Sequence, residues 1–566
     1  MSLHDDNKQG FIEWCKRGEP MIWMNAAAVT VSTLAVIGLL LLLAVRGFGH
    51  FWPSAVMQAQ YALPSETTVT IMAERVESEA VPIEQLLSAG FKIETDDAFV
   101  DRELVKLGNR DVSGADFKWV ISRYLNDVTY PEDAVVIERR EWGNFYGYLL
   151  AVKEQGQVVA SLEDGRAWEE FQTRVIRANE IHEQIKKIEK KDIGAINYRL
   201  EKLRLKSRGL ELNTSMAEGR REQIQADLAA ERAELDAQYK VMQSELADLY
   251  RQWHRDSFTM KTASGQVKDQ RISTVVQAYQ PNSMNFAQKI GFYFTKFGEF
   301  LTDEPREANT EGGIFPAIFG TVIMVLIMSV LVTPFGVVAA VYLREYAKQG
   351  VMTRIVRIAV NNLAGVPSIV YGVFGLGFFI YFLGSEMDKA FFPEALPAPT
   401  FGTPGLLWAS VTLALLTLPV VIVATEEGLA RIPRNLREGS LALGATKAET
   451  LWRVVLPMAS PAMMTGLILA VARAAGEVAP LMLVGVVKLA PSLPVDGNFP
   501  YFHLDQKFMH LGFHIYDVGF QSPNVEAARP LVYATALLLV VIIALLNLSA
   551  VALRNHLREK YKSLEM

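Results

Sequence analysis

Six long apolar segments alternate with polar stretches along the 566 residues of the chain. The first, residues 26–45, is a run of twenty residues without a charge, the length that a helix needs to cross a bilayer. The others occupy the second half of the chain, at residues 314–343, 358–385, 395–425, 458–487 and 530–553. Only residues 458–487 carry charges, which are Arg473 and Glu477. The pattern predicts a mainly α, polytopic membrane protein with six transmembrane helices.

The first apolar run differs from a cleaved signal peptide. A signal peptide has a shorter apolar core, a basic segment before it and a small-x-small cleavage site after it. Here Arg46-Gly47-Phe48 follows the run, so we expect residues 21–46 to form a retained anchor behind a polar tail at residues 1–20. The chain has a single cysteine, Cys15, which lies in that tail. A single cysteine cannot form an intrachain disulfide.

Residues 51–313 contain no membrane-length apolar run. Strand-like segments such as residues 68–71, 146–152 and 271–278 alternate there with helix-like pieces, which predicts an α+β domain. Residues 165–253 are instead rich in charged residues, Gln and Ala, with apolar residues at three- and four-residue steps. These apolar residues fall in two successive stretches, or limbs. They are Ile181, Ile185, Ile188, Ile196, Leu200 and Leu203 in the first, and Ile224, Leu228, Leu235, Tyr239, Met242, Leu246, Leu249 and Trp253 in the second.

These two limbs predict a coiled-coil helical hairpin inserted into the α+β domain, with Gly209, Asn213 and Gly219 interrupting the helices. Each limb, of about 40 residues, would reach roughly 60 Å. The alternative is a long coiled coil that dimerises between two chains, and the sequence does not separate the two.

Basic residues gather in three short segments. They are Arg344, Lys348, Arg354 and Arg357 in one loop, five residues within 426–457, and Arg554, Arg558, Lys560 and Lys562 in the tail at residues 554–566. The positive-inside rule places these segments and both termini in the cytoplasm. The domain at residues 51–313 then lies outside the cell membrane, in the periplasm of a Gram-negative host, which predicts a multi-pass protein of the inner (plasma) membrane. The net charge of -6 conceals this segregation.

The polar segment at residues 426–457 has a distinctive spacing. Glu438-Gly439-Ser440 is followed by three residues, Gly444, nine residues, Val454, one residue and Leu456-Pro457. Two short helices, at residues 437–443 and 445–455, would meet at a turn that Gly444 permits, and a proline would end the pair. This resembles EAA-x3-G-x9-I-x-LP, the cytoplasmic coupling loop of ABC-importer permeases, with Gly439 and Ser440 in place of two alanines. The alternative is an ordinary solvated helix pair between two spans.

Further motifs indicate which kind of ABC-importer permease the chain resembles. They are Gly312-Gly313-Ile314, residues 316–321, 339–347 and 363–372, Thr425-Glu426-Glu427-Gly428, and residues 473–480, which read RAAGEVAP. Together they resemble the A-type permease subunits of the phosphate-specific (Pst) ABC importers, over residues 312–553. The anchor and the external domain resemble only the long form of that subunit. The resemblance implies a type-1 ABC-importer permease core at residues 314–553, which couples to an ATPase through Glu438, Gly439, Ser440, Gly444, Leu456 and Pro457.

Arg473 and Glu477 are the candidate residues of the substrate path. Four residues apart on a helix, they would share a face. A charge at membrane depth is costly and normally faces the interior of a bundle or an aqueous path. The planar guanidinium donors suit phosphate oxygens. The alternative is a structural ion pair that helps the bundle to pack.

The resemblance also implies partners. They are a homologous C-type permease, a dimer of the ATPase subunit and a periplasmic phosphate-binding protein. The chain has no G-x-x-x-x-G-K-[ST] motif, so ATP would be hydrolysed by the separate subunit and this chain would bind no cofactor of its own. No nucleophile–base constellation or nucleic-acid module occurs, so we expect no enzymatic activity. His503, His510 and His514 lack a tight ligand pair, which favours an interfacial helix over a metal site.

Two alternative functions remain at this point. One is a permease for another oxyanion, such as sulfate or molybdate, against which residues 363–372 and 473–480 argue. The other is an envelope scaffold or sensor built on the coiled coil. A sensor needs a cytoplasmic signalling module, and the predicted cytoplasmic segments are too short to hold one.

Overall fold

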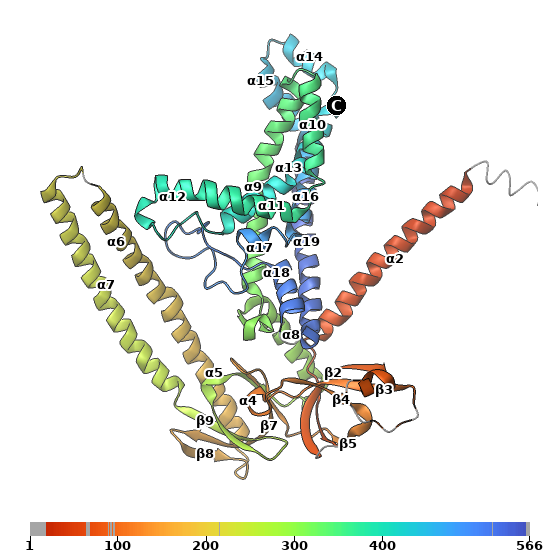
Figure 1. Ribbon diagram of the computed structural model, residues 1–566, viewed down its shortest axis with the longest axis vertical. Helices are drawn as coiled ribbons and strands as arrows, with labels where there is room; N and C mark the ends of the chain where they lie inside the picture. Colours follow the sequence, from red (N-terminus) through yellow and green to blue (C-terminus); the bar gives the residue numbers. More distant parts are fainter. Residues whose placement is uncertain are drawn as a thin grey trace, which may run out of the picture.

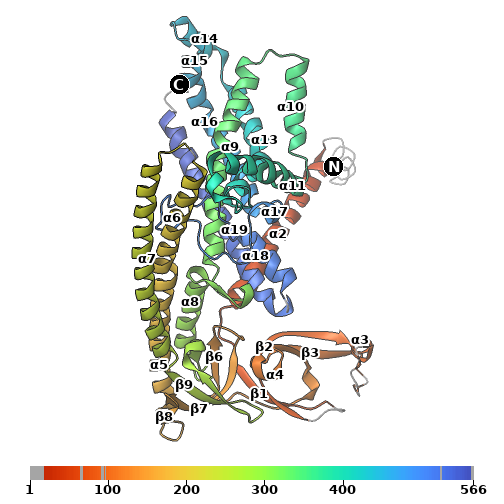
Figure 2. The ribbon, with the colours of Figure 1, turned by 60° about the vertical axis from the view of Figure 1, so that its left-hand side comes forward.

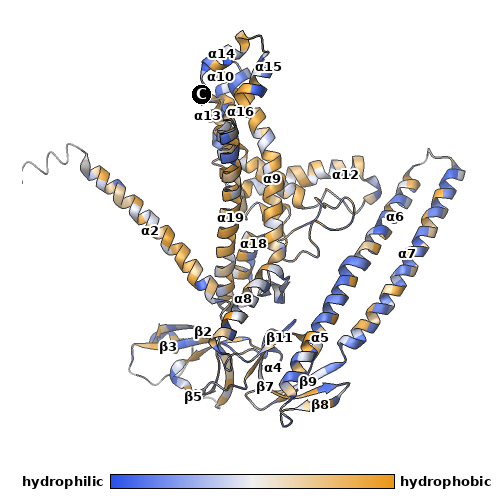
Figure 3. Cartoon of the chain, turned by 180° about the vertical axis from the view of Figure 1, so that it is seen from behind, coloured by the Kyte–Doolittle hydropathy of each residue, from blue (hydrophilic) through white to orange (hydrophobic). Residues whose placement is uncertain are grey.

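The computed structural model describes residues 18–561 except 64–67, 89, 91–92, 94, 96, 214 and 523–524. Cys15 and most of the expected N-terminal tail lie outside these residues. A bundle of long apolar helices forms one part of the molecule, a β-rich region lies at one end of the bundle, and a helical hairpin rises from that region beside it (Figures 1 and 3).

Six helices in the described residues are long and apolar enough to cross a membrane, as predicted. They are α2 (Glu19–Gly49), α9 (Phe315–Val341) continued by η5 (Tyr342–Tyr346), α11 (Ser368–Phe374) continued by η6 (Gly375–Gly384) and α12 (Ser385–Phe391), α13 (Leu406–Arg431), α16 (Leu456–Gly476) and α19 (Val525–Tyr561). The anchor α2 contacts α19 near its C-terminal end, where a side chain on Gly47 would meet the backbone of Ala534 at 3.0 Å, and diverges from the bundle towards its N-terminal end (Figure 1).

Three of the expected boundaries are wrong. The third span begins at Ser368 and not at residue 358, because α10 (Val351–Leu363) is a separate helix that ends before Pro367. The fourth begins at Leu406 and not at residue 395. The fifth ends at Gly476 and not at residue 487, and the short helix α17 (Leu481–Val484) follows it. Apolar residues outside the spans lengthen the apolar runs in all three cases: residues 477–487 are buried or half-buried, whereas α10 and residues 396–399 are mostly exposed.

The described residues of the β-rich region form two antiparallel sheets. One has the order β4-β3-β2-β1-β5; the other has the order β10-β9-β7-β6-β11, with β8 paired to β7. The strands are β1 (Val56–Tyr61), β2 (Val69–Pro82), β3 (Phe99–Lys106), β4 (Phe117–Ile121), β5 (Leu125–Thr129), β6 (Val135–Arg139), β7 (Phe145–Glu154), β8 (Gln157–Ser161), β9 (Asp256–Lys261), β10 (Val267–Arg271) and β11 (Val275–Tyr279). Short helices α3 (Ile83–Ser88) and α4 (Arg110–Ser113) join strands of the region.

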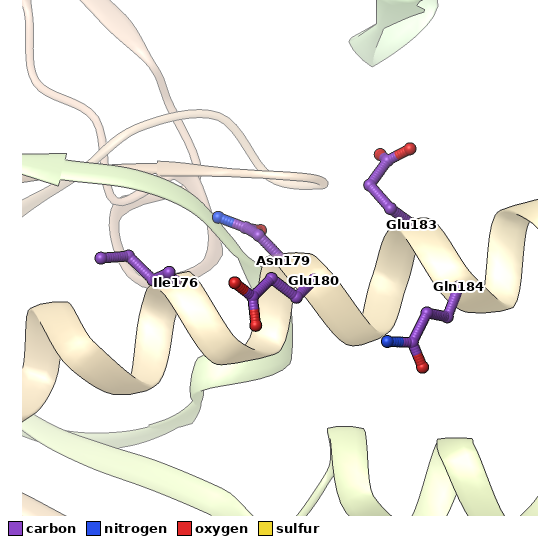
Figure 4. Close-up of a pocket in the computed structure, with 5 residues that line it drawn as sticks. All are labelled: Ile176, Asn179, Glu180, Glu183 and Gln184. Carbon is purple, nitrogen blue, oxygen red and sulfur yellow. The ribbon is translucent and has the colours of Figure 1, made fainter.

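Helix α5 (Ala167–Lys187) packs on the second sheet, where the rings of Phe171 and Phe258 lie 4.9 Å apart in a buried core. Asn179 also fastens α5 to that sheet, because its side-chain amide donates to the Val276 carbonyl at 2.8 Å. On the neighbouring turns, Glu180 and Glu183 line an open surface hollow of about 590 Å³ (Figure 4).

The helical hairpin leaves the sheet after β8 and returns to β9. Its first limb is α5, a π-helical turn η2 (Ile188–Ile193) and α6 (Gly194–Leu212), and its second limb is α7 (Glu218–Trp253). Ile196, Leu203 and Leu235 are buried between the limbs, so the hairpin closes within one chain. The predicted interruption is too wide, because Gly209 and Gly219 lie inside the helices: the first limb ends at Leu212 and the second begins at Glu218.

The junction between the β-rich region and the bundle is rich in ion pairs. After α8 (Phe286–Thr302), the strands β12 (Pro305–Arg306) and β13 (Glu311–Gly312) flank η4 (Glu307–Asn309) and lead into α9. Lys106 on β3 lies 3.6 Å from Glu311, and Lys296 on α8 lies 2.7 Å from Glu138 on β6. Burial raises the pKa of the Glu311 carboxyl, and Lys106 opposes that shift. These contacts line a cavity of about 880 Å³.

Candidate functional site

The segment at residues 426–457 forms two short helices joined by a tight turn. Helix α14 (Arg434–Ala442) ends before Gly444, which adopts a φ of +88°. A side chain there would meet nothing within 4 Å, so the backbone conformation alone calls for glycine. Thr446 then caps α15 (Lys447–Thr450) in a capping box with Glu449, and η8 (Leu451–Val455) runs into α16. The predicted pair of helices is therefore present, with the first starting three residues earlier than expected.

One side of this segment is buried against the bundle and the other is open. Ile432, Leu451 and Val455 pack in a buried cluster with residues of α9, α13 and α16. On the open side the side chains of Leu443 and Trp452 are 91% and 75% exposed. The segment lies at the end of the bundle opposite the β-rich region, near the last described residues (Figure 1). Two large apolar side chains held open at the tip of the molecule favour a protein partner there.

Ion pairs fasten the segment to the neighbouring helices. Arg437 lies 3.1 Å from Glu345 on η5 and donates to the Leu429 carbonyl at 2.6 Å. Lys447 donates to the Glu345 backbone carbonyl, and Arg357 on α10 pairs with Glu426. Glu345 is a residue that the sequence analysis missed, since nothing near it in the chain indicates a partner 92 residues away.

Glu438, Gly439 and Ser440 lie on α14, and Leu456 and Pro457 open α16. Glu438 and Gly439 are exposed, whereas the Ser440 hydroxyl lies 2.9 Å from that of Thr450, which joins the two short helices. The structure thus brings the six predicted coupling residues into one compact element, with the charged Glu438 on its surface.

Arg473 and Glu477 lie together, but not as two residues of one helix. Helix α16 ends at Gly476, and Glu477 has an extended backbone with ψ 134°. The helix ends there because the ring of Pro480 would collide with the Gly476 carbonyl in a continued helix. The side chains still meet, with Arg473 Nε 3.5 Å from Glu477 Oε1, and they are 35% and 20% exposed. Both are therefore accessible to a small ion.

The segments that carried the resemblance meet beside this pair. A Cβ on Gly372 would lie 2.7 Å from Pro480 Cα and 3.0 Å from the Pro480 carbonyl oxygen. Tyr371 donates its hydroxyl to the Leu363 carbonyl at 2.6 Å, across the break between α10 and α11. Residues 363–372 and 473–480, about a hundred positions apart, thus pack against each other.

In the permease that the sequence resembles, Gly372→Ala is expected to lower uptake at least about tenfold, because the added methyl group would push the chain around Pro480 away from α11. Gly377→Ala is the matched control, since a side chain at Gly377 on the same span meets nothing within 4 Å. Uptake is measured at equal membrane levels of the two variants. Equal uptake by both would show that the contact does not position Arg473.

A buried polar cluster lies where the β-rich region joins the bundle. Asn309 donates to the Lys488 carbonyl at 2.9 Å and to Asp517 at 3.2 Å, and the Lys488 ammonium lies 3.1 Å from the same carboxylate. His514 is also buried, and burial lowers its pKa to about 4, so its ring is neutral at pH 7. A short helix is present around His514, because α18 (Leu511–Tyr516) contains it and packs against α9 and α19, and its location at a membrane interface stays a prediction.

The three histidines do not gather into one site. His503 lies 2.8 Å from Asp496 on a separate loop, and His510 accepts the Gly512 N–H at the start of α18. Within the described ranges, no three His, Cys, Asp or Glu side chains are placed to hold a metal ion.

Comparisons with known proteins indicate the family of the chain. Residues 332–563 match the family described as binding-protein-dependent transport system inner membrane component. The chain is 36% identical to "Phosphate transport system permease protein PstA 1" of Mycobacterium tuberculosis over 244 residues, 43% of this chain and 71% of that protein. It is 35% identical to PstA of Mycobacterium leprae over 269 residues, 47% of this chain and 79% of that protein.

Among solved structures, an inward-facing MetNI methionine ABC transporter aligns with a TM-score of 0.32 and 20% identity, over 43% of this chain and 94% of that one. The sequence matches are the informative ones. They cover more than two thirds of each mycobacterial relative, and the family match includes both residues 426–457 and Arg473. The chain is a multi-pass membrane protein and a member of the PstA family of phosphate transport system permeases.

Proposed function

We propose that this chain is the transmembrane permease subunit of an ATP-driven importer of inorganic phosphate, and forms half of its translocation path. The observation that carries the proposal is the sequence match to PstA proteins across the part of the chain that holds Arg473 and the coupling segment. The chain is a transport component and not an enzyme. A permease for sulfate or molybdate is less consistent with that match.

The partners follow from the two ends of the bundle. The exposed Leu443 and Trp452 are suited to insert into a groove of a separate ATPase subunit, with Glu438 beside them. A homologous C-type permease completes the path, and a phosphate-binding protein docks at the end near the β-rich region. In this arrangement both termini, the Arg344 loop and the coupling segment are cytoplasmic, and the external region is periplasmic.

Arg473 supplies positive charge and a donor fork to a phosphate ion in the path, and Glu477 holds the guanidinium when the path is empty. Both side chains are partly exposed, so the ion pair opens without the full cost of separating buried charges. Transport also requires that the ion leaves again, and an acidic neighbour keeps the site from holding phosphate too tightly.

The test is uptake by the whole importer, reconstituted with its C-type permease, ATPase subunits and phosphate-binding protein. We expect ATP-dependent accumulation of labelled phosphate that excess sulfate and molybdate do not reduce. A control without ATP should show no accumulation. Competition by sulfate or molybdate at concentrations similar to those of phosphate would contradict the proposed substrate.

A further inference from the structure

The limb of the hairpin that faces the bundle contacts an external loop of the permease. Helix α6 lies between α7 and the bundle in both ribbon views (Figures 1 and 2). The Tyr198 hydroxyl donates to the Phe499 carbonyl, and the Lys202 ammonium lies 3.5 Å from the same oxygen and 5.2 Å from the centre of the Phe499 ring. The Tyr198 and His503 rings pack edge to face at 6.2 Å. The hairpin is therefore held over the loop between α17 and α18.

The two limbs carry opposite net charge. The inner limb (α5, η2 and α6) contains eleven Lys and Arg residues and eight Asp and Glu residues, and nine of these basic residues but only three of the acidic ones lie at residues 186–208. The outer limb, α7, contains five basic and eight acidic residues. A solvated hairpin has no need of such an asymmetry, and here the basic side is the one turned toward the permease. A basic surface in this position attracts an acidic partner.

Part of the basic limb is free to bind such a partner. Arg199, Lys202 and Lys206 are spaced i, i+3, i+7 and therefore share one face of α6. Arg199 and Lys206 are exposed and make no ion pair with any residue that the structure describes. On another face, by contrast, Arg204 and Arg208 are neutralised by Glu201 and Glu211, at 2.7 and 2.6 Å.

Exposed aromatic rings stand next to this basic face. Phe499 and Tyr501 are 66% and 57% exposed at the tip of the external loop. The tip is ordered by Asp496, which accepts the backbone N–H of Asn498 at 2.8 Å and pairs with His503. Exposed aromatic rings beside arginine are typical of protein interfaces, and recognition of a free anion has no use for them.

We propose that Arg199, Lys206, Phe499 and Tyr501 form a docking surface for an acidic face of the substrate-binding protein. The surface holds that protein beside the external loops while it delivers its cargo. This inference rests on the proposed function, because it takes the β-rich region to be periplasmic and the chain to work with a substrate-binding protein. The hairpin then has a role in transport that is separate from the folding of the permease core.

The experiment uses proteoliposomes that contain the whole importer, with ATP inside and the purified phosphate-binding protein of the same organism added outside. Uptake is recorded against binding-protein concentration for the wild type and for the double variant Arg199→Glu, Lys206→Glu. The matched control is Arg232→Glu, Lys240→Glu on α7, which makes the same change in charge at exposed positions of the outer limb. Lys202 is left intact because it also holds Phe499.

The half-maximal concentration of binding protein should rise about tenfold in the inner-limb variant at low salt, and stay within twofold of the wild type in the control. Added KCl should raise the half-maximal concentration of binding protein more for the wild type than for the variant. An unchanged half-maximal concentration overturns the docking surface. The docking surface is also overturned if the variant differs from the wild type only by slower uptake at saturating binding protein. That result would assign the basic face to the phosphate ion. Absence of phosphate uptake by the wild type would instead contradict the proposed function.

Discussion

Arg473→Gln is expected to reduce phosphate uptake at least about 100-fold while the importer still assembles. The substitution removes the guanidinium beside Glu477 and leaves a carboxylate that repels a phosphate ion. Loss of a charge-assisted contact of this kind costs about 2–5 kcal/mol, which is enough for such a decrease. Uptake is measured at matched permease levels, with ATP hydrolysis recorded alongside.

Two further substitutions separate a role in the path from a role in packing. Arg473→Lys keeps the charge but loses the planar donor fork, so partial uptake is expected at most. Glu477→Gln keeps the cation and should impair uptake less than Arg473→Gln. Normal uptake by Arg473→Gln would make the residue a structural partner only. Failure of both single variants with recovery in the exchanged pair, Arg473→Glu with Glu477→Arg, would establish a structural ion pair.

Gly444→Val is expected to abolish both phosphate uptake and the stimulation of ATP hydrolysis, with insertion in the membrane unchanged. A β-branched residue at a φ of +88° is strained by about 1–3 kcal/mol, and the turn relieves the strain by moving α14 relative to α15. Leu443, which immediately precedes the turn, would move with it away from the ATPase subunit.

Gly444→Asn is the control for this change, because asparagine tolerates a left-handed backbone and adds a side chain where nothing lies within 4 Å. It should retain most of the uptake. If Gly444→Val transports normally, the turn does not transmit movement between the two proteins. If Gly444→Asn fails as completely as Gly444→Val, the side chain obstructs the ATPase directly and backbone strain is not the cause.

Hydropathy predicts how many helices cross the membrane better than it predicts where they end. Residues 477–487 are almost uncharged, yet Pro480 ends α16 and the chain folds into α17 against α11. Residues 395–405 read as the start of a span, but they form a loop whose N–H groups at Phe401 and Gly402 are bound by Asp388. An apolar loop buried in a bundle and the end of a span have the same composition, so their sequence does not distinguish them.

The sequence likewise predicts only part of the candidate site. The spacing of the coupling segment predicts its turn because that geometry is local, and Gly444 has the expected conformation. Arg473 and Glu477 are adjacent for a different reason from the one predicted, since the helix ends between them. The buried contact of Asn309 with Asp517 joins positions 208 residues apart. No periodicity or spacing in one sequence predicts a contact of that kind.

The insertion of the hairpin has a consequence for the order in which the chain acquires its structure. Strands β7 and β9 pair along their length, yet about a hundred residues of α5, α6 and α7 separate them. Closing so long a flexible loop is entropically costly and slows folding. Once the two limbs of the hairpin have paired through Ile196, Leu203 and Leu235, its two ends lie side by side. We therefore expect helix pairing to precede completion of the sheet, and a substitution that weakens the hairpin seam to delay maturation of the strands far from it.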